Sequence, residues 1–294
     1  MPGRSALPDV ANRLLGQPTQ DWQPVGGGCI GDCARVTLTD GRSVFVKTMA
    51  DPPAHFFAAE AAGLRWLAEA GGPPVPEVLA AGEDGIALAW VPTAGASATA
   101  AEQLGGELAR MHAAGADSFG APWSGFIGSL PMDNSPAADW PTFYAERRLL
   151  PYARQAFDRG HLDADQLALV ERVADRLGEL AGQAEPPARI HGDLWSGNLH
   201  WAADGRCWLL DPAAHGGHRE TDLAMLALFG APHLDRLVDA YREAATDLGA
   251  PLADGWRDRI PLHQLWPLLV HAVLFGSGYG AQAAAAARTA LRTN

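Results

Sequence analysis

The amino-acid sequence predicts an α+β protein with two lobes. Residues 1–92 would form a small strand-rich lobe with one main helix, and residues 93–294 a larger, mainly helical lobe. Two segments before residue 50 alternate apolar and polar residues, which is typical of half-buried strands. After Pro92 the apolar residues instead recur mostly at helical spacing. A cleft between two such lobes is a natural ligand site.

The strands and the helix of the first lobe follow from short segments. Residues 34–40, ARVTLTD, and residues 42–47, RSVFVK, alternate, and the Asp-Gly pair between them favours a hairpin. Residues 54–71 carry apolar side chains at helical spacing and end at a glycine, as helices commonly do. The apolar run IALAWV, residues 86–91, suits a buried strand that crosses to the second lobe.

The second lobe is predicted to contain helices over residues 98–114, 139–157 and 163–182. Residues 265–287 are strongly apolar, but a histidine, glycines and a glutamine interrupt them, which predicts buried helices rather than a membrane span. Residues 115–137 form a long segment dense in Gly, Pro, Ser and aromatic residues. Loops of this length in compact domains are often functional.

The composition narrows the class of protein. Hydrophobic residues make up 48% and charged residues 19% of the 294 positions, as in ordinary globular proteins. A net charge of −12 argues against nucleic acid or an anionic membrane as a partner. The N-terminus lacks the pattern of a signal peptide, so we expect a cytoplasmic protein, either a monomer or a homodimer. Cys29 and Cys33 have no second cysteine pair, so ordinary reduced thiols are expected rather than a zinc site.

A glycine run precedes the first predicted strand. Gly26, Gly28 and Gly31 satisfy G-x-G-x-x-G, but an alternating segment follows where a dinucleotide-binding fold needs a helix. Between antiparallel strands, such glycines let backbone N–H groups approach phosphate oxygens. A glycine-rich hairpin without a ligand is the alternative.

Lys47 ends the second predicted strand, and alternation places it on the face opposite Val44 and Val46. Glu60 lies in the following helix among alanines and phenylalanines, which favours an inward-facing carboxylate. A strand lysine held by a helix glutamate is the ion pair found in kinases. The alternative is a solvated lysine and a surface glutamate.

The segment RIHGDLWSGNLHW, residues 189–201, carries the most specific pattern. Phosphoryl transfer needs a carboxylate that orients and deprotonates the attacking hydroxyl, and an oxygen ligand for magnesium on the same loop. Asp193 and Asn198 provide these two groups. Asp211 follows the apolar strand RCWLL, where a further ligand for a hard cation is expected.

Competing sites fit these residues less well. His191, His200 and His215 lack the spacing of zinc enzymes, and Ser196 does not lie in a G-x-S-x-G turn. We expect His191 to brace the loop and His112 to be a packed core histidine.

HGDLWSGN, followed by LLDPAAHGGHRETDLAMLALFG, closely resembles the fructosamine kinase (ketosamine-3-kinase) family, within the aminoglycoside and choline kinase-like branch of the protein-kinase fold. GGGCI, VFVK and DWPTFYAERRL resemble the same family, so the resemblance runs from about residue 20 to the end. It implies a bilobal protein-kinase-like fold and an enzyme that uses ATP and Mg2+. The implied reaction phosphorylates the sugar 3-hydroxyl of ketosamines, which are adducts of free amines or protein lysines, and leads to deglycation.

The resemblance also implies roles for individual residues. Lys47 would contact the α- and β-phosphates and be held by Glu60, and Asp193 would be the catalytic base. Asn198 and Asp211 would bind magnesium. The glycine loop and the crossing strand would bind the nucleotide, the strand through its backbone; these residues are Gly26, Gly27, Gly28, Cys29, Ile30, Leu88, Ala89, Trp90 and Val91.

Some alternatives stay open. Trp195, His218 and Glu220 are candidate walls of the acceptor site, although His218 and Glu220 could equally form a helix-start cluster. The acceptor could be an aminoglycoside or an amino alcohol, and a nucleotide-binding pseudokinase is the alternative class of protein. Cys29 lies in the phosphate-facing loop, so its oxidation could lower activity.

Overall fold

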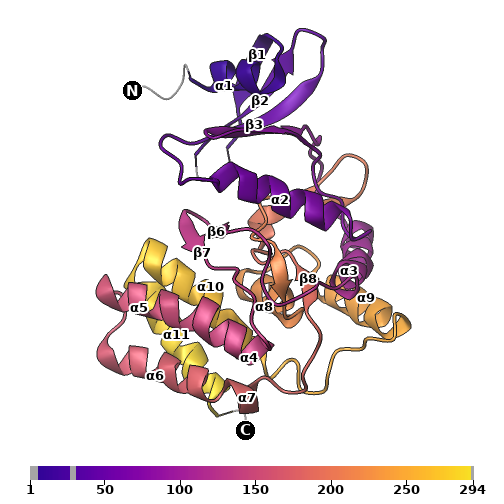
Figure 1. Cartoon of the computed structure of the whole chain (residues 1–294). Coiled ribbons are helices and arrows are strands. Elements are labelled where there is room, and N and C mark those ends of the chain that lie inside the picture. Colours follow the sequence, from indigo (N-terminus) through magenta and orange to yellow (C-terminus); the bar gives the residue numbers. More distant parts are fainter. Residues whose placement is uncertain (1–5, 27–30, 293–294) are drawn as a thin grey trace.

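The structure is a computed structural model that describes residues 6–26 and 31–292 (Figure 1). A small lobe built on one sheet lies above a larger, mainly helical lobe, which confirms the α+β fold class. The predicted boundary at residue 92 lies between β5 and α3. The elements of the first lobe are α1 (Ala6–Leu15), β1 (Thr19–Pro24), β2 (Asp32–Leu38), β3 (Ser43–Thr48), α2 (Phe56–Ala68), β4 (Val78–Ala81) and β5 (Gly85–Ala89).

The sheet of the first lobe is antiparallel, with the strand order β1-β2-β3-β5-β4. Val44 and Val46 of β3 point into an apolar cluster shared with α1. Phe45 points to the other face, where it packs with residues of α2, and Lys47 lies on that same face. The predicted alternation in this strand is therefore confirmed, and it directs the lysine toward the second lobe.

The second lobe consists mainly of helices, with short two-stranded pairs between them. Its elements are α3 (Ala98–Ala113), β6 (Gly125–Ile127), β7 (Leu130–Met132), α4 (Trp140–Phe143), the π-helix η1 (Tyr144–Leu149), α5 (Leu150–Asp158), α6 (Ala164–Asp175), α7 (Leu177–Leu180), β8 (Ala188–Ile190), the 3-10 helix η2 (Ser196–Asn198), β9 (Leu199–Trp201), β10 (Cys207–Leu209), β11 (His215–Gly217), α8 (Glu220–Phe229), α9 (Leu234–Asp247), α10 (Ile260–Phe275) and α11 (Ser277–Ala290).

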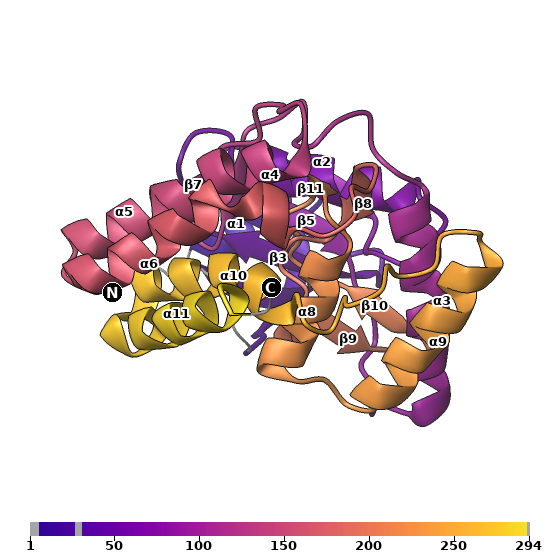
Figure 2. The ribbon, with the colours of Figure 1, turned by 90° about the horizontal axis from the view of Figure 1, so that it is seen from below.

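Two apolar clusters organise this lobe. Helices α10 and α11 lie beside α5 and α6 around a core that includes Trp266, so the predicted buried C-terminal helices are confirmed (Figure 2). The second cluster crosses between the lobes, because it joins Leu64 of α2 and Leu88 of β5 to Leu199 of β9 and Leu209 of β10. The two lobes therefore share part of their hydrophobic core.

Several elements differ from the sequence prediction. The edge strand β1 was not predicted, because its residues are mostly polar and exposed and give no alternating signal. The single helix predicted over residues 139–157 is divided into α4, the π-helix η1 and α5. Pro151 lies at the start of α5, where it cannot donate a backbone hydrogen bond. Residues 115–137 contain the hairpin β6–β7, which lies beneath the N-terminal end of α2 in Figure 1.

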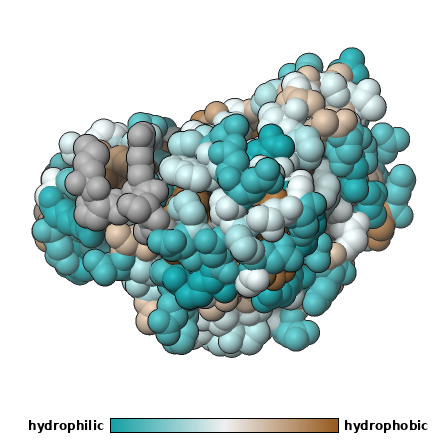
Figure 3. Space-filling view, turned by 90° about the horizontal axis from the view of Figure 1, so that it is seen from above, coloured by the Kyte–Doolittle hydropathy of each residue, from teal (hydrophilic) through white to brown (hydrophobic). Residues whose placement is uncertain are grey.

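The face seen from above the first lobe is covered mainly by hydrophilic residues, with hydrophobic ones scattered among them (Figure 3). Among the helices in the described part of the chain, none combines the length and the hydropathy that crossing a membrane requires.

Candidate active site

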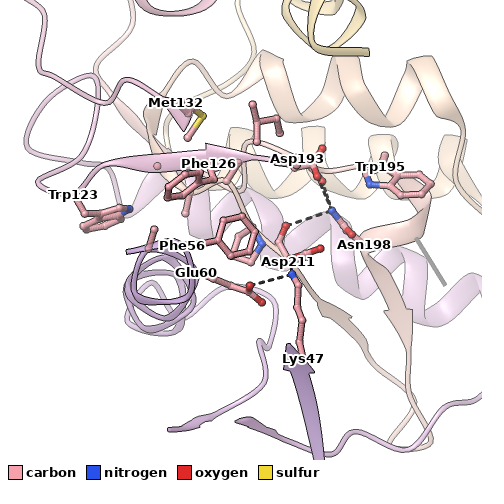
Figure 4. Close-up of a pocket in the computed structure, with 17 residues that line it drawn as sticks. Lys47, Phe56, Glu60, Trp123, Phe126, Met132, Asp193, Trp195, Asn198 and Asp211 are labelled. Carbon is pink, nitrogen blue, oxygen red and sulfur yellow. Dashed lines mark hydrogen bonds and ion pairs between the residues drawn. The ribbon is translucent and has the colours of Figure 1, made fainter. Parts of the chain in front are cut away.

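Lys47 stands between the two lobes. Its ammonium group contacts the Glu60 carboxylate of α2 at 3.0 Å and the Asp211 carboxylate of the second lobe at 2.5 Å (Figure 4). The side chains of Lys47 and Glu60 are 3% and 9% exposed, so neither is a solvated surface charge. The predicted ion pair of strand lysine and helix glutamate is present, and it extends to the predicted metal ligand.

Burial and charge act against each other in this cluster. Burial alone would lower the pKa of Lys47, but the carboxylates of Glu60 and Asp211 outweigh it and raise that pKa. Burial raises the pKa of Glu60, and the opposing effect of the Lys47 charge, which lowers that pKa, is smaller. Lys47 is therefore held in its charged form and can contact an anion that enters the cleft.

Asp222 of α8 holds the loop that follows β8. Its carboxylate accepts the backbone N–H groups of His191, at 2.8 Å, and Gly192, at 2.9 Å. His112 contacts the same carboxylate at 3.1 Å, which confirms the prediction of a packed core histidine. Gly192 has a φ of 79°, and an added Cβ would lie 2.3 Å from the Ala213 carbonyl oxygen, so only glycine fits there.

His191 braces the loop, as predicted. Its Nε2 lies 2.9 Å from the carbonyl oxygen of Leu210, and its Nδ1 accepts the backbone N–H of Asp193 at 3.2 Å. Burial lowers the pKa of His191, which favours the neutral ring that this pair of bonds requires. The histidine thus ties the loop carrying Asp193 to the chain just before Asp211.

Asp193, Asn198 and Asp211 converge on one side of the cleft (Figure 4). The amide nitrogen of Asn198 donates to the Asp193 carbonyl at 2.8 Å and to its carboxylate at 3.1 Å. Burial and the nearby charge of Asp211 raise the pKa of Asp193 to about 7. Such a pKa suits a carboxylate that accepts a proton near neutral pH.

These residues fit a divalent cation by their chemistry. Among its described lining residues, the cleft holds the carboxylates of Glu60, Asp193 and Asp211 against the ammonium of Lys47, so negative charge is in excess. Asn198 makes its hydrogen bonds through the side-chain amide nitrogen. Its side-chain oxygen therefore remains available to bind a metal ion. Carboxylate and amide oxygens are the ligands that Mg2+ prefers.

Two pockets meet at Asp193. The first contains the charged residues above, and its other lining residues are Phe56, Ala59, Trp123, Gly125, Phe126, Ile127, Gly128, Met132, Trp195, Pro212, Ala213 and Ala214. The second is almost entirely apolar, and its lining residues are Ile127, Gly128, Gly192, Asp193, Trp195, Met225, Trp266, Pro267, Val270, His271, Leu274 and Phe275. Asp193 and Trp195 therefore stand between a charged compartment and an aromatic one.

The loop over residues 115–137 closes one side of both pockets, in line with its predicted functional role. Phe126 of this loop packs on Phe56 of α2, with ring centroids 5.0 Å apart. The loop is anchored by the buried guanidinium of Arg148, which donates to the Asp133 carbonyl at 2.6 Å and to the Asn134 side chain at 2.7 Å. The guanidinium also lies over the ring of Phe143, in the helix α4.

His218 and Glu220 do not line either pocket. Glu220 is buried and receives two hydrogen bonds from Arg259, at 2.9 and 2.6 Å. The Nδ1 atom of His218 accepts the backbone N–H of Glu220 at the first turn of α8. These contacts fit the alternative of a helix-start cluster, and the acceptor role of the two residues stays a prediction.

His218, Glu220 and His263 also form, within residues 6–26 and 31–292, a group whose ligand atoms lie within 4.8 Å of one another. Both carboxylate oxygens of Glu220 are already bonded to the cationic Arg259. A positive neighbour disfavours a metal ion, so this group is a buried ionic cluster and not a metal centre.

The ionic cluster makes a prediction about stability and pH. Burial would raise the pKa of Glu220, but the His263 ring, 3.3 Å away, and the hydrogen bonds from Arg259 outweigh it and lower the pKa to about 2. A carboxyl group whose pKa is lower in the folded than in the unfolded protein stabilises the fold at pH values above its unfolded pKa. That stabilisation is lost as the pH falls toward its folded pKa. Relative to the ordinary glutamate pKa of 4.5, a pKa of about 2 corresponds to about 3 kcal/mol.

We expect Glu220→Gln to lower the free energy of unfolding in urea by about 3 kcal/mol at pH 7. The difference from the unmodified protein should shrink as the pH falls from 4.5 toward 2. Glu171→Gln is the control, because Glu171 forms an exposed ion pair with Arg154, worth about 1 kcal/mol or less. A pH-independent effect of Glu220→Gln would contradict the argument.

The nucleotide-binding residues predicted in the first lobe are only partly described. Gly26 is described, whereas Gly27, Gly28, Cys29 and Ile30 lie outside the described residues, and with them the hypothesis about Cys29 oxidation. Gly31, which follows, has a φ of 109°, and an added Cβ would lie 2.2 Å from the Thr48 carbonyl oxygen, so the chain needs glycine there.

The crossing strand is described throughout. Leu88 is buried, the backbone N–H of Ala89 donates to the Glu77 carbonyl, and Trp90 lies under the guanidinium of Arg35. His200 contacts the carbonyl oxygen of Val91 at 3.0 Å. The adenine contact of residues 88–91 stays a prediction.

The aromatic compartment was not predicted from the sequence. Trp266, His271 and Phe275 were assigned only to buried C-terminal helices. His271 interrupting an otherwise apolar helix was the available signal, because a polar ring in such a run needs a polar partner or a pocket.

Comparisons with known proteins give a consistent result. A family model described as fructosamine kinase matches residues 6–293. A crystal structure assigned as a fructosamine-3-kinase, from Thermobifida fusca, is 52% identical, with a TM-score of 0.90 over 97% of this chain and 98% of that one. The protein-ribulosamine 3-kinase, chloroplastic, of Arabidopsis thaliana is 35% identical over 88% of this chain and 79% of that protein.

More distant solved structures share the fold alone. An aminoglycoside phosphotransferase solved with ADP and hygromycin B is 18% identical, with a TM-score of 0.63 over 97% of this chain. The predicted protein-kinase-like fold is therefore confirmed.

Proposed function

Because the chain belongs to the fructosamine kinase family, whose members are phosphotransferases acting on a sugar hydroxyl, we propose that it phosphorylates ketosamines. The phosphoryl donor would be ATP, and the acceptor the 3-hydroxyl of the sugar portion. The observation that carries the proposal is the position of Asp193, where a charged pocket and an apolar aromatic pocket meet. A polyanionic donor suits the first pocket, and an uncharged sugar ring suits the second.

On the donor side, Lys47 supplies the positive charge that the phosphates need. Glu60 holds the ammonium group in place from α2, so Lys47 stays charged although it is buried. Asn198 and Asp211 would hold Mg2+, which would offset the charge of the phosphates when bound. The complex of an aminoglycoside phosphotransferase with ADP supports a nucleotide donor in this fold.

On the acceptor side, Asp193 orients the sugar hydroxyl toward the γ-phosphorus. The hydroxyl proton passes to the Asp193 carboxylate. The oxygen of the sugar hydroxyl forms the new bond to the γ-phosphorus, and the bond between this phosphorus and ADP breaks. The raised pKa of Asp193, about 7, makes the carboxylate a stronger base than an exposed aspartate. The phosphorylated ketosamine would then break down and release the amine, which amounts to deglycation.

The test is ADP formation from ATP and Mg2+ with a panel of acceptors: fructosyl-lysine, ribulosyl-lysine, kanamycin, choline and no acceptor. We expect turnover on the ketosamines alone. Turnover only on kanamycin or choline would keep the catalytic residues but overturn the acceptor. Bound ATP without turnover on any acceptor would favour a pseudokinase.

A further inference from the structure

Phe275 is the most exposed of the large hydrophobic side chains that the structure describes as exposed, at 66% against 37% for Leu150 and 47% for Leu248. It is the last residue of α10, and Gly276, with a φ of 105°, ends the helix directly after it. Burying an aromatic ring is strongly favourable, so a ring this exposed gains contact area when a ligand covers it.

The exposed ring is held in place by its neighbours. Its centroid lies 5.3 Å from that of His271 and 6.2 Å from that of Tyr279. His271 and Tyr279 contact each other at 5.0 Å, and Nδ1 of His271 lies 2.7 Å from the Pro267 carbonyl oxygen. A ring fixed in this way is a preformed surface that a ligand can cover at little entropic cost.

Phe275 belongs to the same pocket as Asp193. An aromatic wall leads from one to the other, because Trp195, which also lines the pocket, packs on Phe229 at 6.2 Å and Phe229 packs on His271 at 4.8 Å. Among the described residues that line this pocket, Asp193 is the one acidic group, and there is no lysine or arginine. Away from Asp193, the described lining is therefore apolar except for His271, whose Nδ1 is bonded to the Pro267 carbonyl.

The chemistry of a ketosamine fits this arrangement. Its nitrogen is attached to the first sugar carbon, two carbons from the hydroxyl that would be phosphorylated, and the amine substituent extends away from the sugar. When the hydroxyl lies at Asp193, the other residues that line the same pocket, from Trp195 to Phe275, are available to contact the substituent. An alkyl chain gains most from contact with an aromatic face in water.

We propose that Phe275 forms the subsite for the alkyl substituent on the amine of the acceptor and sets the preference for adducts of long-chain amines. This inference rests on the proposed function, since it deepens the description of the same acceptor site. Phe275 binds the substrate away from the reacting atoms, so it should affect KM rather than the chemical step.

The test compares two acceptors that share the sugar: fructosyl-lysine and 1-amino-1-deoxyfructose, which has no alkyl substituent. In the unmodified protein we expect a lower KM for fructosyl-lysine. Phe275→Ala should raise that KM about tenfold, which equals about 1.4 kcal/mol, with kcat and the KM for ATP unchanged. The KM for 1-amino-1-deoxyfructose should stay the same, and Phe275→Tyr should retain the preference.

Leu248→Ala is the matched control, because it removes an exposed hydrophobic side chain at the end of α9, outside both pockets. Equal KM values for fructosyl-lysine in Phe275→Ala and in the unmodified protein would overturn the inference while leaving the proposed function intact. A parallel loss on both acceptors would also overturn it. Absence of turnover on both acceptors in the unmodified protein would overturn the proposed function itself, and this inference with it.

Discussion

Replacing Asp193 with asparagine should lower kcat by about a thousandfold, within the range expected for losing a general base, while nucleotide affinity changes little. The amide has the shape of the carboxylate but cannot accept the proton of the acceptor hydroxyl. The loop itself should persist, because its backbone is held by Asp222 and His191 rather than by the Asp193 side chain. Steady-state kinetics and calorimetric titration with ADP would measure the two effects separately.

The same variant should be at least as stable as the unmodified protein when no nucleotide or Mg2+ is present. Burial and the nearby charge of Asp211 raise the pKa of Asp193, so its ionised form is unfavourable in the folded state. A neutral amide removes that unfavourable charge, and the melting temperature at pH 8 should rise. Asp247→Asn, at the exposed end of α9, is the control.

In the kinetic experiment, residual activity of Asp193→Asn above one tenth would contradict the assignment of Asp193 as the base.

The second large effect is expected for Lys47→Met. Loss of the ammonium group should lower kcat/KM by about a hundredfold or more, because it removes a preorganised charge aimed at the donor phosphates. The variant should also lose about 3 to 5 kcal/mol of stability, since Glu60 is left buried without its partner. Urea unfolding and ADP formation measure the two losses.

A double variant separates these contributions. Lys47→Met with Glu60→Gln removes the charge on both partners, so most of the stability should return while activity stays low. Recovery of activity in the double variant would show that Lys47 acts only as a structural ion and would remove it from the site.

The sequence predicted those parts of the site in which local pattern determines position. Lys47 could be oriented because the period of a strand fixes which face each side chain occupies. Asp193 and Asn198 lie five residues apart, and Asp211 lies two residues beyond β10, so spacing predicted that the three could act together. Their individual roles stay predictions. Contacts between distant segments were not accessible in this way.

Asp222 illustrates the limit. Its carboxylate accepts two backbone N–H groups of the catalytic loop. In the sequence, however, Asp222 and its neighbours indicate only an ordinary first turn of a helix. Glu220 lies on the same helix two residues earlier, and its bonds to Arg259 were not predicted, because a sequence pattern does not say which distant partner a carboxylate meets. Phe275 was missed for the opposite reason: an apolar residue in an apolar helix gives no sign that it faces water.

The apolar cluster that joins Leu64 and Leu88 to Leu199 and Leu209 has a consequence for how the chain folds. We infer that the two lobes, divided at residue 92, do not fold independently. Each lobe alone would expose part of the shared apolar cluster to water. Large parts of the molecule should then unfold together. Helix α2 packs on both lobes, because its Glu60 holds Lys47 of the sheet and a Cβ added at its Gly63 would lie 3.2 Å from Ala214 of the second lobe.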